Sequence, residues 1–168
     1  MHIKTLHLCK LGMLLSISLI IFCVEAQIPP IVPIPGIKLG LSNIITVYAL
    51  IKLGKIDALK ILSLRIILAS IFAGQAVSFI YSLSGALSSY IAMCFFSKFL
   101  SEKQIWILSI IAAISHNLGQ ICAAIFLIKN NAVIYYLPFL MISGIIAGAF
   151  TGLSTQFLCN RKDIKKAL

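Results

Sequence analysis

The sequence predicts an all-α integral membrane protein, folded as a single bundle of about six transmembrane helices. Of its 168 residues, 61% are hydrophobic and 11% are charged, and the mean hydropathy is +1.09. Soluble domains contain roughly 25% charged residues, so a chain this apolar is expected to lie in a lipid bilayer. Its length holds about five or six helices of roughly 20 residues and leaves no room for a soluble domain.

Six apolar runs, separated by charged or turn-forming residues, mark the expected spans of this single membrane domain, residues 1–168. The runs cover approximately residues 11–28, 39–53, 56–73, 77–96, 105–128 and 133–158. The first run ends near Val24-Glu25-Ala26, which resembles the small-residue cleavage site of a signal peptide. We expect a retained helix, because the run reaches the spanning minimum at Ile28 and a glutamate beside the cleavage site is unusual. Cleavage before Gln27 is the alternative.

The basic residues lie at the ends of the apolar runs. With six spans and the N-terminus inside, eleven Lys and Arg residues fall on the inner side and only Lys38 and Lys129 on the outer side. This asymmetry predicts that both termini are cytoplasmic. The net charge of +10 could also suggest nucleic acid, but the basic residues are scattered and have no aromatic side chains between them. We therefore expect the lipid bilayer, and no nucleic acid, as a partner.

One stretch interrupts the apolar sequence, PPIVPIPGIKLGLSN from Pro29 to Asn43. Its four prolines cannot continue a helix, and Gly36 permits a tight turn. We expect an extended or re-entrant segment, followed by a helix that begins near residues 37–39. The unpaired N–H groups at that helix start, together with Lys38, would form an anion cradle on the outer side. The alternative is a Pro-rich loop whose lysine lies among lipid headgroups.

Arg65 is the residue whose insertion into the bilayer costs the most free energy. It lies about nine residues into the third run, close to the bilayer centre. An arginine at this depth costs about 2.5–3.5 kcal/mol on insertion scales. Its side chain is therefore expected to face the bundle interior or a wet cavity. It would serve there either in a structural ion pair, with Glu25 as the candidate partner, or as a contact to a ligand.

A polar patch at the centre of the fifth run consists of His116, Asn117 and Gln120. His116 and Gln120 are one helical turn apart and share a face with small alanines, so that face can approach its neighbours closely. A single histidine would indicate hydrogen-bonded packing. Three polar groups at the membrane midplane favour the lining of a cavity, because each would otherwise need its own buried partner.

Small residues predict two packing faces. In the sixth run, Gly144, Gly148 and Gly152 form two overlapping GxxxG units, which serve either internal packing or a partner subunit. In the fourth run, small and hydroxyl residues recur on one helical face, as Ser78, Ser82, Gly85 and Ser89.

No residues with catalytic or metal-binding spacing stand out. The five cysteines are isolated, and the four carboxylates are dispersed along the chain. A prenyl diphosphate synthase needs clustered aspartates to hold Mg²⁺ against a diphosphate, and a transport ATPase needs a GxxxxGK[ST] loop. Neither pattern is present in the sequence. We therefore expect no enzyme, no metal site and no cofactor.

Three motifs together resemble a known bacterial family. They are PGIKLGLSNI at residues 35–44, HNLGQ at residues 116–120, and YYLP at residues 135–138 with the pairs Ser143-Gly144 and Thr151-Gly152. In this order, from about Glu25 to Leu158, they resemble the family called Gx transporter or heptaprenyl diphosphate synthase component I. That family is similar to the substrate-binding S components of energy-coupling factor (ECF) transporters, which are bundles of about six helices.

The resemblance implies a multi-pass protein of the bacterial cytoplasmic (inner) membrane with one of two functions. The first is an S-component-like, substrate-binding transport subunit for a small solute, linked to isoprenoid or menaquinone metabolism, with ECF transmembrane and ATPase subunits as partners. The alternative is the non-catalytic component I of heptaprenyl diphosphate synthase, whose partner is a soluble catalytic subunit. In the first case we expect a shared cavity whose substrate-binding residues are Lys38, Asn43, Arg65, His116, Asn117 and Gln120. The residues do not identify the substrate or the direction of transport.

Overall fold

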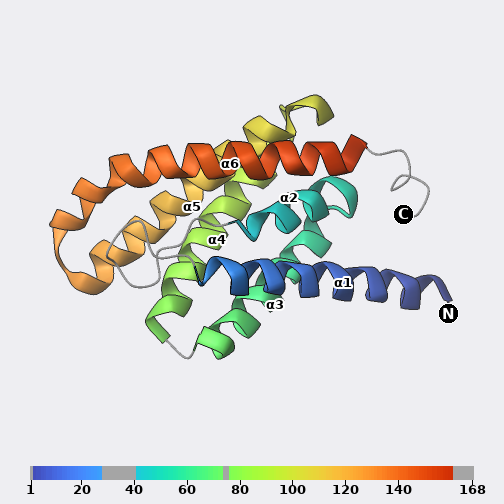
Figure 1. The fold of residues 1–168 in the computed structure, drawn as a ribbon, viewed down its shortest axis with the longest axis horizontal. Helices are drawn as coiled ribbons and strands as arrows, with labels where there is room; N and C mark the ends of the chain where they lie inside the picture. Colours follow the sequence, from blue (N-terminus) through green and yellow to red (C-terminus); the bar gives the residue numbers. More distant parts are fainter. Residues whose placement is uncertain (1, 28–40, 74–75, 161–168) are drawn as a thin grey trace.

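The computed structural model describes residues 2–27, 41–73 and 76–160. Within these ranges the chain forms six α-helices, two short 3-10 helices and no strand, so the predicted all-α class is confirmed (Figure 1). The helices are α1 (His2–Glu25), α2 (Asn43–Lys52), α3 (Lys55–Ala73), α4 (Ala76–Phe96), η1 (Glu102–Gln104), α5 (Ile105–Ile128), η2 (Asn131–Tyr136) and α6 (Leu137–Asn160).

Four helical segments in the described ranges are long and apolar enough to cross a membrane. They are Lys4–Glu25, Phe79–Phe96, Ile105–Ile128 and Ala132–Asn160. By contrast, α2 has only 10 residues, about 15 Å at the usual rise, whereas the hydrocarbon core is about 30 Å thick. The helix is shorter than the predicted run 39–53 because it begins at Asn43, and residues 28–40 before it lie outside the described part of the chain.

The short helix α2 lies inside the bundle, enclosed by longer helices (Figure 1). Seven of its 10 residues are buried, and Val47 and Ala49 are fully enclosed. A cluster of buried apolar side chains packs α2 against α3, α4 and α5, which contribute Ile61, Met93 and Leu108. Gly54 then turns the chain into α3 with a φ of +96°, a conformation that favours glycine. The start of α2 is consequently placed in the protein interior.

Helices α5 and α6 are packed at close range along the three glycines of α6. A Cβ atom built on Gly148 would lie 2.8 Å from Cα of Ile110, and one built on Gly152 would lie 2.5 Å from Cα of Trp106. Close backbone approach of this kind is what small residues allow between membrane helices. The face that carries the glycines therefore points at α5.

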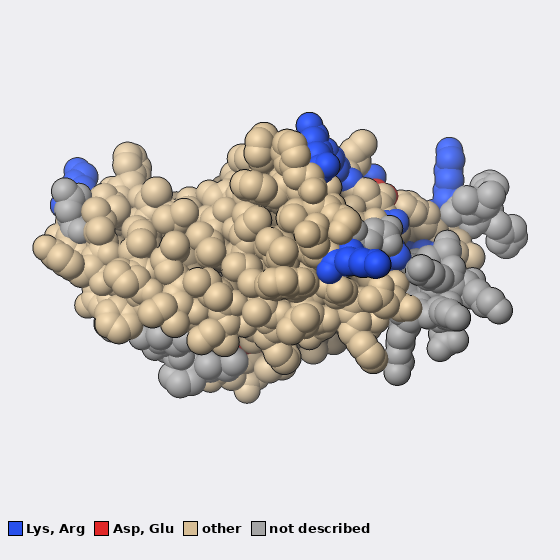
Figure 2. Space-filling model, turned by 90° about the horizontal axis from the view of Figure 1, so that it is seen from above, with Lys and Arg blue, Asp and Glu red and all other residues tan. Residues whose placement is uncertain are grey.

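The opposite face of α6 carries a regular stripe of large apolar side chains. They are all exposed: Phe139, Ile142, Ile146, Phe150, Leu153 and Phe157. Figure 2 shows a surface that is mostly uncharged, with most Lys and Arg side chains in the half of the molecule where α1 begins and α6 ends. An apolar exterior with charge gathered toward one end is typical of a chain that lies in a bilayer.

Candidate functional site

Arg65 points into the bundle from the middle of α3 and is 6% exposed. Its Nη1 donates a hydrogen bond to Oγ of Ser42, and its Nη2 donates one to Oδ1 of Asn43 at 3.3 Å. Both partners lie at the start of α2. The guanidinium therefore joins α3 to the buried end of α2, as expected of an arginine that cannot face lipid.

Ser42 connects Arg65 to Glu25. The side chain of Ser42 does not cap α2, since its hydroxyl accepts from Arg65, while its backbone N–H donates to Oε2 of Glu25 at 3.5 Å. Glu25, the last residue of α1, is only 4% exposed. Its carboxylate is thus held near the positive end of α2 and lines the same cavity as the guanidinium. The local sequence marks Ser42 only as a candidate cap, because a serine directly before the first residue of a helix is the usual capping position, and gives no sign of its contact with Arg65.

His116 and Gln120 lie on the face of α5 that meets α4. They lie against Gly85, where an added Cβ atom would come within 2.8 Å of His116 Cε1 and of Gln120 Cγ. Both side chains are buried. Oε1 of Gln120 has no hydrogen-bond partner within the described part of the chain, which is also true of Oδ1 of the neighbouring Asn117, whereas buried polar atoms in proteins normally have one. Nδ1 of His116 lies beside Gly85.

These groups converge on one small, partly open cavity of about 30 Å³. Its polar wall consists of Glu25, Ser42, Arg65, Ser82, His116 and Gln120. Its apolar wall consists of Phe22 from α1 and of Ile66 and Ala69 from α3. Five elements far apart in the sequence therefore contribute to one site, and Arg65 shares it with His116 and Gln120.

Two of the other predicted residues, Asn117 and Asn43, do not line this cavity. Asn117 lies on the other side of α5, where its Nδ2 donates to the carbonyl oxygen of Leu140 at 2.6 Å. The reason is helical geometry, because successive residues are about 100° apart while residues four apart share a face. Asn43 supports Arg65 but does not line the cavity. Lys38 lies outside the described residues.

A second, more open hollow of about 470 Å³ lies between α4 and α5. Its lining combines small residues with large apolar ones, as Ser84, Ser88, Ser115 and Gly119 with Ile91, Phe95 and Leu118. Ser84 donates to the carbonyl oxygen of Gly119 at 2.7 Å, which ties the two helices together. None of the residues that line the small cavity lines this hollow.

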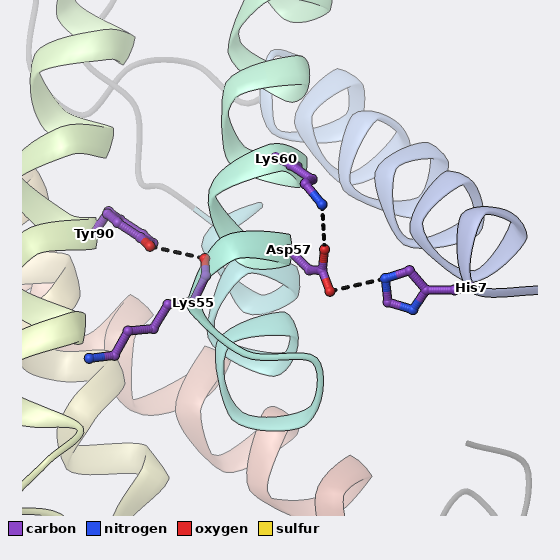
Figure 3. A network of polar contacts seen from close by, with 5 residues as sticks. All are labelled: His7, Lys55, Asp57, Lys60 and Tyr90. Atoms are coloured by element: carbon purple, nitrogen blue, oxygen red, sulfur yellow. Dashed lines mark hydrogen bonds and ion pairs between the residues drawn. The ribbon is translucent and has the colours of Figure 1, made fainter. Parts of the chain in front are cut away.

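Polar contacts near the start of α3 link it to α1 and α4 (Figure 3). Asp57 contacts Nε2 of His7 and Nζ of Lys60, each at 3.0 Å, and Tyr90 donates to the carbonyl oxygen of Lys55 at 2.9 Å. The side chain of Lys60 is mostly exposed, and that of His7 is 45% exposed. This cluster therefore ties helices together at the surface and is distinct from the buried cavity.

Comparison with known proteins gives one match. A family model described as heptaprenyl diphosphate synthase component I matches residues 14–158, a range that includes every residue of the cavity wall. No curated protein and no solved structure matches the chain.

Proposed function

We propose that this chain, which belongs to the heptaprenyl diphosphate synthase component I family, is the non-catalytic membrane subunit of a prenyl diphosphate synthase. The observation that carries the proposal is the family match over residues 14–158. The word "component" in that description implies a second chain, which would be the soluble catalytic subunit.

The distribution of acidic side chains supports a non-catalytic role for this chain and a catalytic role for a second chain. Prenyl transfer to a diphosphate substrate requires Mg²⁺ held by clustered carboxylates. Glu25 is enclosed in the bundle, whereas Asp57 belongs to the surface cluster with His7 and Lys60. Across the ranges 2–27, 41–73 and 76–160, no three His, Cys, Asp or Glu residues are grouped so that they could hold a metal ion. The proposal assigns the metal-dependent step to the partner.

The membrane subunit is proposed to lie in the bacterial cytoplasmic membrane with both termini in the cytoplasm. The count of eleven inner against two outer basic residues supports this orientation. The gathering of Lys and Arg in the half where α1 begins agrees with it (Figure 2). A cytoplasmic synthase would then meet the end of the molecule that carries the surface cluster around Asp57.

A second candidate function, favoured by the cavity, is a substrate-binding transport subunit. A chain that only anchors a synthase gives no reason for a cavity whose wall combines Arg65 with His116 and Gln120. In this role the chain would bind a small solute and work with ECF transmembrane and ATPase subunits.

Reconstitution distinguishes the two functions. The purified chain in nanodiscs is mixed with the prenyl synthase homologue of the same organism, and chain elongation is followed with radiolabelled isopentenyl diphosphate. We expect binding of the two chains, and long-chain product only when both are present. A synthase that is fully active alone and does not bind the membrane chain would overturn the proposal. Co-purification of ECF transmembrane and ATPase subunits from native membranes would support transport in its place.

A further inference from the structure

The open hollow between α4 and α5 has the size of a ligand site. Its volume of about 470 Å³ lies within the range of about 300–1,000 Å³ that is usual for pockets of small-molecule ligands. Along α4 its lining extends from Ser84 to Phe96, which is about 18 Å at the rise of about 1.5 Å per residue. The hydrocarbon core of a bilayer is about 30 Å thick, so the hollow is long enough to cross more than half of its depth.

The hollow is a groove with a floor of small side chains and a rim of large ones. Gly119 is buried on the floor, where an added Cβ atom would come within 2.5 Å of Oγ of Ser88, so α4 and α5 are in contact beneath the groove. The rim consists of exposed apolar side chains, Ile91, Phe95 and Leu118. A chain lying in the groove would therefore have helix backbones beneath it and apolar side chains beside it.

The lining favours an apolar, branched occupant. None of the residues that line the hollow is charged, and the hydroxyl of Ser84 is already bonded to the carbonyl oxygen of Gly119. Small side chains recur at every fourth position of α4, as Ser84, Ser88 and Ala92, about 6 Å apart along the helix. A floor with notches at regular intervals accommodates a hydrocarbon chain that carries regularly spaced methyl branches.

One end of the hollow lies beside an aromatic cluster and a lysine. The rings of Phe95 and Phe96 are 5.2 Å apart, those of Phe95 and Phe99 are 5.4 Å apart, and the first two residues line the hollow. Aromatic side chains often gather where a helix leaves the hydrocarbon core. Lys98 is exposed and follows one turn after Phe95, to whose carbonyl oxygen its backbone N–H donates at 3.4 Å.

The charge at this end suits an anionic head. Lys98 is one of the basic residues that the proposed orientation assigns to the cytoplasmic side. An ammonium group is a common partner of phosphate groups in proteins. A molecule whose apolar chain lies in the hollow would therefore present a phosphate head to Lys98 and to the cytoplasm.

We propose that the hollow between α4 and α5 holds the prenyl chain of a prenyl diphosphate, with the diphosphate head at the cytoplasmic end beside Lys98. This inference rests on the proposed function, because the family description supplies the prenyl class. The uncharged groove and the cation at one end supply the site. The membrane subunit thus keeps the apolar chain of the partner's product in the bilayer, while the head stays accessible from the cytoplasm.

Binding of a labelled prenyl diphosphate tests the inference. Tritiated geranylgeranyl diphosphate is bound to the full chain in nanodiscs, and empty nanodiscs measure partition into the lipid. Unlabelled geranylgeranyl diphosphate and hexadecyl diphosphate, which lacks the methyl branches, serve as competitors. We expect saturable binding that the prenyl compound displaces about tenfold better than the straight-chain compound. Equal displacement by hexadecyl diphosphate, or binding no greater than that of empty nanodiscs, would overturn the inference.

Variants that fill the hollow place the chain. Cys122 lines the hollow and is exposed, so Cys122→Phe adds bulk there and should weaken binding about tenfold. Cys23→Phe, the same substitution at an exposed position of α1, is the matched control and should bind normally. Ser115→Leu also fills the hollow and serves if Cys122→Phe accumulates poorly. Normal binding by the hollow variant, or an equal loss in Cys23→Phe, would contradict the assigned site.

Lys98→Gln tests the position of the head. It should weaken the binding of geranylgeranyl diphosphate several-fold and leave that of geranylgeraniol unchanged, because only the diphosphate is anionic. Lys60→Gln, which removes a lysine of the surface cluster on α3, is the matched control. An equal loss in both variants would mean that the head is attracted by the basic end as a whole, and it would contradict the placement beside Lys98.

The binding test is independent of the synthase partner. A chain that activates the synthase but binds no geranylgeranyl diphosphate would refute the inference and leave the proposed function intact. A chain that binds this probe in the hollow but neither binds nor activates the synthase would refute the proposed function and leave the assigned site intact.

Discussion

The two sides of α5 use polar residues in opposite ways. On the side that meets α6, Ser109 and Thr151 share a hydrogen bond of 2.8 Å, Asn117 bonds the backbone of Leu140, and Gly148 brings the two helices into contact. On the side that meets α4, His116 and Gln120 lie against Gly85 and line the small cavity together with Arg65.

The two sides of α5 differ in whether their polar residues pack against another helix or line a cavity. In a membrane the interior of a bundle is no more apolar than its exterior, so helices associate through close contact and hydrogen bonds. Between α5 and α6 the hydroxyls of Ser109 and Thr151 and the amide N–H of Asn117 bond across the contact, although Oδ1 of Asn117 is buried without a partner, so this contact is chiefly structural. On the other side of α5, His116 and Gln120 line a cavity, so a water-sized group can enter beside them.

The largest effect is expected from a substitution in the contact between α5 and α6. Gly148→Leu would drive a large side chain into the backbone of Ile110, and we expect a loss of about 3 kcal/mol or more, at or above the upper end for overpacking. Most of the protein should then fail to fold, as measured by monodisperse yield in detergent. Gly12→Leu on α1 is the matched control, because an added Cβ atom there meets nothing within 4 Å. Similar yields for both variants would show that the glycine face does not hold α5 to α6.

The next effect concerns the charged wall of the cavity. Arg65→Met removes the donor to Ser42 and Asn43 and leaves the carboxylate of Glu25 in a buried site. Breaking a buried charge arrangement of this kind costs about 3–5 kcal/mol, somewhat less where water enters. We expect a clear fall in the thermal unfolding temperature, with partial recovery in the double variant Arg65→Met, Glu25→Gln. A double variant no more stable than Arg65→Met alone would mean that the two charges are not coupled.

Asn117→Ala and Gln120→Met compare the two sides of α5 within the motif HNLGQ at residues 116–120. The structure predicts a loss of about 1–2 kcal/mol from the missing hydrogen bond to Leu140. Gln120→Met should leave stability equal or higher, because a buried acceptor without a partner is removed. Thermal unfolding measured on both variants tests this contrast, which fails if Gln120→Met destabilises the protein as much as Asn117→Ala.

The smallest effect is expected at the surface. Asp57→Asn weakens the contacts to His7 and Lys60 (Figure 3), but both partners are about half exposed to solvent, and ion pairs of this kind contribute about 0–1 kcal/mol. We expect the unfolding temperature to change little, and less at high salt than at low salt. A loss as large as that of Arg65→Met would indicate that this end of the molecule holds α1 in place.

Local periodicity accounts for the parts of the site that the sequence predicted. An arginine in mid-helix has to turn away from lipid, and His116 and Gln120 share a face because they are four residues apart. The same rule separates Asn117 from them, so the grouping of all three residues in one patch overlooked the angular spacing. Ser42 was missed because its role depends on Arg65, 23 residues away.

The sequence by itself determined the all-α membrane class, the approximate helices and the inward direction of Arg65, because hydropathy and helical spacing are properties of neighbouring residues. Only the tertiary structure decided that α2 is a short buried helix, that Glu25 and Arg65 meet through Ser42, and that the glycines of α6 face α5. The physical reason is that both faces of a membrane helix are apolar, so the face that meets each neighbour is set by packing and hydrogen bonding between distant segments.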